Sequence, residues 1–135
     1  MKHNNQFPIE KSEAEWREIL DEKRFHVLRE KGTEYPDTGA FNLHFDNGQY
    51  VCAACANPVF ESSQKFKSSC GWPSFDEAMQ GSVQSVQDNT HGMNRTEIVC
   101  SNCGGHLGHV FNDGPTESGQ RFCINSLSLD FKEGN

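Results

Sequence analysis

Two Cys-x-x-Cys pairs constrain this chain more than any other feature of its sequence. The first pair is Cys52 and Cys55, the second is Cys100 and Cys103, and 44 residues separate the pairs. A gap of two residues lets both sulfurs turn toward one ion, and four thiolates satisfy tetrahedral zinc. Because the spacing exceeds the about 15–20 residues of a compact zinc ribbon, the second pair must return through tertiary structure. The sequence therefore predicts one structural zinc ion that joins two distant hairpins.

Paired cysteines have two other common uses besides zinc binding. A redox-active pair usually opens a helix in a βαβ context, and neither pair here is followed by a helical pattern. An iron–sulfur cluster is the second alternative, since it uses the same ligands. His106 could replace one thiolate, but a fourth cysteine is already present. Zinc is the favoured interpretation.

The apolar content explains why a cross-link is expected. Leu, Ile, Val and Phe make up 27 of the 135 residues, the mean hydropathy is -0.73 and the formal net charge is -7. This composition borders on that of disordered chains, so a thin core of aromatic rings needs a covalent or metal cross-link. The excess of 19 Asp and Glu over 12 Lys and Arg argues against a surface for binding nucleic-acid phosphates.

The N-terminal region shows no targeting signal. Residues 1–16 lack the apolar core of a signal peptide, and no apolar run approaches the ~18 residues of a membrane span. Six cysteines without a secretion signal favour metal or redox chemistry in a reducing compartment over a disulfide framework. We expect a cytoplasmic protein with a flexible arm at residues 1–11 and a single domain at residues 12–135.

Capping signals predict two short helices. Ser12 and Glu15 form a capping box, which indicates a helix near residues 13–19. Asp21 can cap a second helix near residues 22–31, which ends at Lys31-Gly32.

From Gly39 onward the pattern is typical of β-structure. Apolar residues alternate with polar ones over residues 41–45, and Asp46-Asn47-Gly48 predicts a hairpin turn into residues 49–52. Helices followed by strands, without βαβ alternation, predict a mainly β, antiparallel domain with short N-terminal helices. Further short strands are expected at residues 58–60, 82–87, 96–100, 110–111 and 121–131.

Cys70 and Cys123 are left over after the metal pairs. Either could be a small buried apolar residue, which is the common fate of a free cysteine. Cys70, however, lies in a turn rich in Ser, Gly and Pro, a poor place for a core residue. Cys123 alternates with Arg121 and Asn125 on one face of the last strand, and a neighbouring cation lowers the pKa of a thiol. Cys123 is therefore a candidate reactive thiol.

His106 and His109 closely follow the second cysteine pair. The segment is too rich in glycine for a helix, and it predicts a tight turn that holds both imidazoles on one side. Such a pair suits proton donation, although one ring could be buried and hydrogen-bonded while the other is solvated. Trp72, between Gly71 and Pro73, is either the wall of an apolar pocket or an ordinary core residue.

Several ordered segments together resemble the B-type methionine sulfoxide reductases. The segments are CGWPSF at residues 70–75, HGM at 91–93, CSNCGGHLGHVFNDGP at 100–115 and GQRFCINSLSL at 119–129, and residues 29–41 and the first cysteine pair also match. The likeness extends from about residue 12 to residue 131, so it is more specific than the cysteine pairs alone.

The resemblance implies two antiparallel β-sheets and an oxidoreductase that repairs methionine-R-sulfoxide in oxidised proteins under oxidative stress. It implies that Cys123 is the nucleophile, that Cys70 is the resolving thiol and that thioredoxin reduces their disulfide. The two Cys-x-x-Cys pairs would hold one structural zinc ion per chain. The side chains expected to polarise, protonate or contact the sulfoxide are His106, His109, Asn125, Trp72, Phe111 and Arg121.

Two functions of other classes are kept as alternatives. The cysteine pairs alone would suit a non-enzymatic zinc-binding module for a protein or nucleic-acid partner. The acidic charge, Cys123 beside Arg121 and the two histidines argue against that function. A zinc hydrolase with His106 and His109 as ligands would need an open coordination position, which four thiolates close.

Overall fold

The structure, a computed structural model, describes residues 7–42, 44–68 and 70–134. Two α-helices come first in the chain, and strands and short 3-10 helices follow. The helices are α1 (Glu13–Ile19), α2 (Glu22–Glu30), η1 (Ser62–Gln64), η2 (Thr90–Gly92) and η3 (Ser126–Ser128). The strands are β1 (Gly48–Cys52), β2 (Pro58–Glu61), β3 (Lys65–Phe66), β4 (Ser74–Phe75), β5 (Val83–Asp88), β6 (Arg95–Cys100), β7 (His106–Phe111), β8 (Arg121–Ile124) and β9 (Leu129–Glu133).

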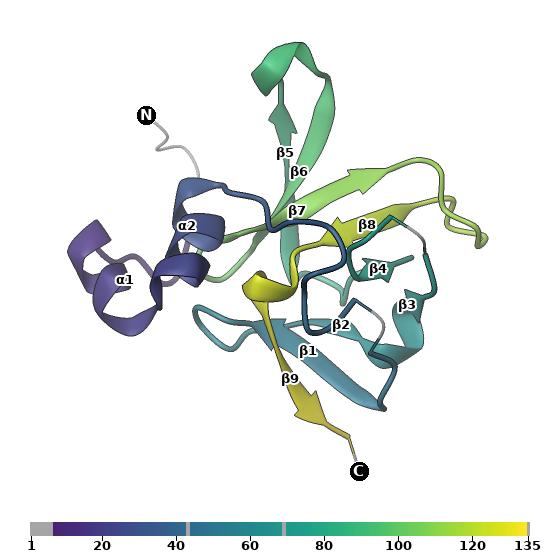
Figure 1. Cartoon of the computed structure of the whole chain (residues 1–135), viewed down its shortest axis with the longest axis horizontal. Coiled ribbons are helices and arrows are strands. Elements are labelled where there is room, and N and C mark those ends of the chain that lie inside the picture. Colours follow the sequence, from purple (N-terminus) through teal and green to yellow (C-terminus); the bar gives the residue numbers. More distant parts are fainter. Residues whose placement is uncertain (1–6, 43, 69, 135) are drawn as a thin grey trace.

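The strands form two antiparallel sheets, which confirms the expected fold class (Figure 1). The smaller sheet has the order β2-β1-β9, and the larger has the order β3-β4-β8-β7-β6-β5. Figure 1 shows the β5–β6 hairpin projecting from the body, with α1 and α2 together on one side of the sheets. The chain passes from the larger sheet to the smaller one through η3, between β8 and β9.

Both predicted helices are confirmed, and their caps explain their bounds. The Ser12 hydroxyl accepts from the Glu15 amide at 3.2 Å, and the Glu15 carboxylate accepts from the Ser12 amide at 2.8 Å. The Asp21 carboxylate accepts from the Arg24 amide at 2.8 Å. Helix α2 ends where Lys31 adopts a left-handed backbone with φ of 61°.

Two strand predictions are wrong. Residues 41, 42, 44 and 45 of the expected strand over 41–45 form no strand, and residue 43 lies outside the described residues; β1 pairs instead with β2 and β9. The Phe41 ring packs on the Tyr50 ring at 5.5 Å, so this segment covers the smaller sheet rather than extending it. The expected strand over 121–131 is divided by η3, where the buried Ser128 hydroxyl donates to the His106 carbonyl at 2.8 Å.

The core consists mainly of aromatic rings. Phe60 and Phe75 stack at 4.2 Å between ring centroids, and Tyr50 and Phe122 pack edge-on against this stack. Trp16 from α1 is 2% exposed and belongs to the same apolar cluster. Burial of each such ring stabilises the fold by roughly 2–3 kcal/mol. A few large side chains thereby replace the aliphatic residues that the composition lacks.

The expected arm and domain boundary remain predictions. Residues 1–6 lie outside the described part, and within residues 7–11 the Ile9 amide donates to the Asn102 carbonyl at 2.9 Å. This contact places residues 7–11 beside the second cysteine pair. Among the described residues, no helix is both long and apolar enough to cross a membrane.

Candidate functional site

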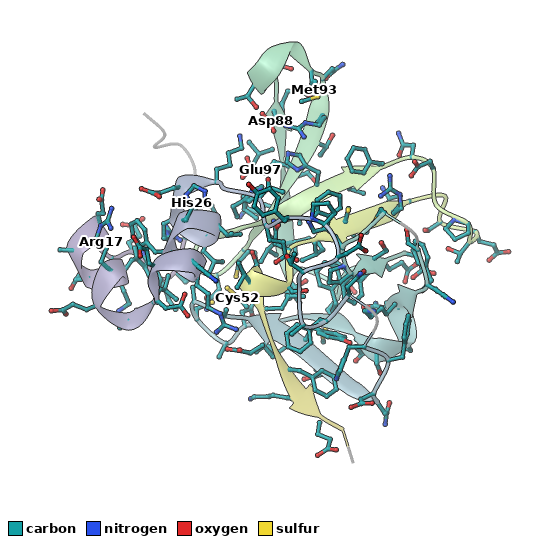
Figure 2. The ribbon with its side chains drawn as sticks, viewed as in Figure 1. Arg17, His26, Cys52, Asp88, Met93 and Glu97 are labelled. Carbon is teal, nitrogen blue, oxygen red and sulfur yellow. The ribbon has the colours of Figure 1, made fainter. Side chains whose placement is uncertain are left out.

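The four cysteines of the two pairs meet at one point, which we call the metal centre. Their sulfurs all lie within 4.8 Å of one another. The Cys52 and Cys103 sulfurs are 3.7 Å apart, and those of Cys55 and Cys100 are 3.6 Å apart. Tetrahedral zinc with bonds of about 2.3 Å would place its sulfurs about 3.8 Å apart, so the arrangement fits such an ion. Cys52 pairs with Leu129 at the start of β9, and in Figure 2 its label lies beside η3, the short helix before β9.

The two cysteine pairs have the same backbone conformation. Cys52 ends β1 and Cys100 ends β6, and the backbone amide of each donates to the carbonyl five residues later, that of Asn57 or Gly105. The amide four residues after each of these cysteines donates back to the carbonyl of the cysteine, at 2.7 and 2.8 Å. The residue four positions after the first cysteine of each pair has a positive φ in both turns, 68° at Ala56 and 77° at Gly104.

Amide groups around the metal centre donate to its sulfurs. The Asn102 backbone amide lies 3.4 Å from the Cys100 sulfur, and the Asn102 side-chain amide lies 3.4 Å from the Cys55 sulfur. The Asn57 side-chain amide approaches the Cys100 sulfur at 3.7 Å. Donors of this kind stabilise negative charge, so the donor set suits thiolates that hold a metal cation.

The two remaining cysteines form a separate thiol pair. Cys70 lies in the loop before β4, and Cys123 lies on β8, where it pairs with Ser74 on one side and His109 on the other. The Cys70 and Cys123 sulfurs are 3.5 Å apart. The Ser74 hydroxyl is 3.3 Å from the Cys70 sulfur. Both cysteines are half-buried, so the pair is neither core nor fully open to solvent.

The thiol pair holds its protons unequally. Its hydrogen bond with Cys123, aided by Ser68 and Ser74, lowers the pKa of Cys70 to about 4. The same hydrogen bond, together with burial, raises the pKa of Cys123, although the charge of Arg121 acts in the opposite direction. Two thiols this close titrate together, so the pair carries one thiolate and one thiol at neutral pH.

A pocket of about 220 Å³ opens at the thiol pair, and it is lined by Thr33, Cys70, Trp72, Arg95, Gly108, His109, Phe111, Arg121, Cys123 and Asn125. Cys123, Cys70, His109, Asn125, Trp72, Phe111 and Arg121, seven of the residues singled out from the sequence, therefore lie together. His106 does not line this pocket, but its ring is 5.4 Å from that of His109. Thr33 also lines a larger groove, of about 960 Å³, between α2 and the segment 33–41.

The two histidines lie on β7, not in the tight turn expected from the sequence. The pairing of β7 with β6 shifts register, so that Val99 faces His106 while Ile98 faces Gly108. The extra residue changes the alternation of side chains by one, and this β-bulge places His106 and His109 on the same face although they are three residues apart. The predicted common side is correct, but a bulged strand produces it.

Each histidine ring is bound by its own carboxylate. Nδ1 of His106 is 2.7 Å from a Glu97 oxygen, and Nε2 of His109 is 2.7 Å from an Asp88 oxygen. The His106 side chain is 3% exposed, whereas that of His109 is 12% exposed and lines the pocket. Burial lowers the pKa of His109 despite the opposing effect of Asp88.

Trp72 and Asn125 are held by the same short segment. The Trp72 indole donates to the Glu34 carbonyl at 3.0 Å, and the Glu34 amide donates to the Asn125 side-chain oxygen at 3.0 Å. The Asn125 side-chain amide donates to the Leu107 carbonyl at 3.1 Å. Segment 33–34 therefore fixes two walls of the pocket.

Arg121 faces the pocket as part of an ion pair. Its guanidinium makes two contacts with the Asp113 carboxylate, at 2.8 and 3.1 Å, and lies 4.8 Å from the centre of the Phe111 ring. Hydrogen bonding to Asp113 raises the pKa of Arg121, so the group stays cationic beside the thiol pair.

The SelR domain family model matches residues 20–133 of this sequence. The chain belongs to the SelR domain family. The match includes all six cysteines and both histidines of β7.

Curated SelR relatives are similar to the chain over nearly its whole length. A "Peptide methionine sulfoxide reductase MsrB" of Variovorax paradoxus is 54% identical over 132 residues, which cover 93% of this chain and 97% of the relative. A protein of the same name from Leptospira interrogans is 50% identical, covering 94% and 98%. A "Probable methionine-R-sulfoxide reductase B" of Caenorhabditis elegans is 46% identical, covering 93% and 85%.

The sequence did not point to several residues of this SelR site. Asp88 and Glu97 bind the histidines, Thr33 and Arg95 line the pocket, and Glu34 holds Trp72 and Asn125. Charged residues on a hairpin ordinarily indicate a solvated face. The sequence pattern that could have indicated two of these residues is the alternation of Arg95 and Glu97, which places both on the same face of β6.

Proposed function

We propose that this chain reduces methionine-R-sulfoxide in proteins to methionine, with Cys123 as the nucleophile and Cys70 as the resolving thiol. The observation that carries the proposal is a pair of thiols 3.5 Å apart at the wall of a pocket that also contains an indole and an imidazole. Membership of the SelR family and the names of the relatives support the same oxidoreductase activity.

The first step transfers the sulfoxide oxygen to Cys123. A sulfoxide oxygen leaves only when it is protonated, so the site needs a thiolate at sulfur and a proton donor at oxygen. Cys70 accepts the proton of Cys123 across their hydrogen bond, which leaves the attacking thiolate on Cys123. The sulfur–oxygen bond of the substrate breaks, one proton arrives from the histidine pair, and Cys123 becomes a sulfenic acid. The substrate sulfur gains the two electrons that the Cys123 sulfur loses.

The second step closes a disulfide. The Cys70 sulfur attacks the Cys123 sulfenic acid, water leaves, and a Cys70–Cys123 bond forms. The two sulfurs start 3.5 Å apart, so a small movement of the loop before β4 is enough. A dithiol protein, thioredoxin in our proposal, then restores both thiols by thiol–disulfide exchange.

The other lining residues divide between binding and proton transfer. The half-buried Trp72 indole and the Phe111 ring offer apolar surfaces for the methyl and methylene groups of the substrate. Asn125 and Arg121 offer donors near the sulfoxide oxygen. His109 is the residue placed to donate the proton directly, with His106 behind it.

One structural zinc ion per chain completes the proposal. Cys52, Cys55, Cys100 and Cys103 would hold it, since their spacing fits a tetrahedral thiolate site. When bound, zinc would supply a cross-link; it would take up no electrons because Zn²⁺ is redox-inactive, and four thiolates would leave no open position for the substrate. The centre would brace the start of β7, and through it the two histidines. A cytoplasmic location, where thiols stay reduced, is part of the same proposal.

The deciding experiment uses separated R and S epimers of a peptide methionine sulfoxide, with dithiothreitol as the reductant. The wild-type protein should release methionine from the R epimer and leave the S epimer unchanged. Cys123→Ser should lose at least about a thousandfold in rate, since an alcohol is a far weaker nucleophile than a thiolate. Turnover of the R epimer by a folded Cys123→Ser variant at the wild-type rate would refute the assignment of the nucleophile.

A further inference from the structure

Three charged side chains outside the pocket surround the histidine pair. Asp88 ends β5 and Glu97 lies on β6, and both belong to the β5–β6 hairpin. Asp88 pairs with Arg95 across the hairpin, and Arg95 and Glu97 alternate along β6. The side chains of Asp88, Arg95 and Glu97 therefore lie on the same face of the hairpin. Figure 2 shows Asp88 farther out on this hairpin than Glu97. The third side chain, Lys31, comes from the end of α2.

Lys31 bridges the two carboxylates. Its ammonium lies 3.3 Å from Oδ1 of Asp88 and 3.2 Å from Oε1 of Glu97. The opposite oxygen of each carboxylate, Oδ2 of Asp88 and Oε2 of Glu97, binds a histidine ring at 2.7 Å. Each carboxylate thus links Lys31 to one imidazole.

The geometry of Lys31 follows from the end of the helix. Its left-handed backbone, with φ of 61°, ends α2 and turns the chain toward the β5–β6 hairpin. Burial alone would lower the pKa of Lys31, but the charges of Glu97 and Asp88 outweigh it and raise the pKa. The ammonium therefore stays charged, and both carboxylates stay ionised beside it.

The four charged groups bound to one another behind the histidine pair, two carboxylates and two cations, balance when both rings are neutral. Charged or titratable groups from four strands and from the end of α2 surround His109. They are Asp88 from β5, Arg95 and Glu97 from β6, His106 from β7, Cys123 and Arg121 from β8, and Lys31 behind the carboxylates. Asp88 and Glu97 are offset by Lys31 and Arg95, whereas Arg121 is already paired with Asp113. Relative to these four groups, a proton on either ring adds a net positive charge, which favours its release.

We propose that Lys31 is a positioning residue for sulfoxide reduction, whose ammonium joins the two histidine–carboxylate pairs into one unit that holds both rings and favours release of a proton toward the pocket. This role rests on the proposed reductase activity. Lys31 does not line the pocket, and it acts on the reaction through Asp88 and Glu97.

The test compares Lys31→Met, which removes the charge, with Lys31→Arg, which keeps it. Lys23→Met is the matched control, because Lys23 is an exposed lysine on the same helix. The measurement is kcat/KM for peptide methionine-R-sulfoxide against pH, with the zinc-loaded full chain. Because the donor must be protonated, activity falls as pH rises through the pKa of the ring.

In Lys31→Met the unbalanced carboxylates should stabilise the imidazolium. The alkaline limb of the profile, where kcat/KM falls, should move to higher pH by about half a pH unit to one pH unit, as expected for the loss of one nearby charge. The maximal rate should fall about 3- to 30-fold, because the ring becomes a weaker acid. Lys31→Arg should restore most of the rate and the original limb, and Lys23→Met should match the wild type.

A titration of the histidine rings by NMR separates this proposal from the reductase assignment. The same upward shift of a ring pKa should appear in Lys31→Met without any substrate. Ring pKa values equal to those of the wild type would overturn the role of Lys31, as would equal losses in the Met and Arg variants. Absence of reductase activity in the wild type would instead refute the proposed function. If Lys31→Met does not fold, Lys31→Gln, which keeps a hydrogen-bond donor without the charge, takes its place in both measurements.

Discussion

The metal centre and the thiol pair both bring cysteine sulfurs to less than 5 Å from one another, but they hold them in different ways. In the metal centre, two turns with matching hydrogen bonds present the sulfurs, and Cys52, Cys100 and Cys103 belong to the buried apolar cluster. In the thiol pair, one sulfur comes from a loop and the other from a strand, and both reach a pocket. A closed set of four thiolates suits a structural ion, whereas an open set of two suits a reaction.

Removal of the metal should produce the largest effect. Structural zinc contributes on the order of 10 kcal/mol to folding, and the aliphatic core of this chain is small. Treatment with a chelator should therefore abolish the cooperative thermal transition, measured by circular dichroism. Cys52→Ser should act in the same direction. An unchanged melting curve in protein shown to be metal-free would remove the contrast between the two sets of cysteines.

Cys70→Ser is the matched substitution in the thiol pair. It should leave the melting temperature within a few degrees of the wild type, because Cys70 is half-buried and lies outside the buried apolar cluster of the described residues. The variant should release one methionine per chain and then stall with thioredoxin as the reductant, a loss of at least about 100-fold in steady turnover. Equal steady rates for the variant and the wild type would remove the resolving role of Cys70.

The pH dependence of alkylation should separate the two sets in a single sample. A thiolate reacts with iodoacetamide and a thiol does not, and the lowered pKa of Cys70, about 4, keeps one thiolate in the pair down to mildly acidic pH. Alkylation of the pair should stay nearly constant from pH 8 to pH 5 and fall only as the pH drops through about 4. The metal-bound sulfurs should stay unmodified throughout, as measured by mass spectrometry of peptides.

The control for this profile is Cys70→Ser, in which Cys123 loses its hydrogen-bond partner. The alkylation of Cys123 should then rise only near the ordinary thiol pKa of about 8.5. A wild-type profile that already falls between pH 9 and pH 8 would contradict the shared thiolate.

The smallest effect concerns the residue with positive φ in each of the two turns of the metal centre. Ala56 adopts a φ of 68°, where Gly104 has 77° in the other turn. Because a side chain disfavours this conformation, Ala56→Gly should stabilise the zinc-loaded protein by about 0.5–1 kcal/mol in denaturant unfolding.

The reverse exchange at the second turn should have the opposite sign. In Gly104→Ala the new Cβ would lie 2.7 Å from the Phe7 ring, and the backbone would be strained as well. A loss of about 1 kcal/mol or more is expected. Equal stability of Ala56→Gly and the wild type would show that the first turn relaxes without cost.

The sequence alone determined the local elements and the division of the cysteines. The capping residues Ser12 and Asp21 set the starts of α1 and α2, because a cap acts on amides two or three residues away. The spacing within each Cys-x-x-Cys pair determined the metal centre for the same local reason. The alternation around Cys123 was visible because side chains in a strand alternate every two residues.

Only the tertiary structure decided what surrounds the reacting groups. The bulge that aligns His106 with His109 depends on the pairing of β6 with β7, and the short strands β3 and β4 are defined by their pairing with each other and of β4 with β8. Lys31, Asp88 and Glu97 come from α2 and the β5–β6 hairpin, and their contacts join residues up to 66 positions apart. Such contacts leave no periodic pattern in the sequence, because a charge on a solvated face and a charge in a buried network are written with the same residue types.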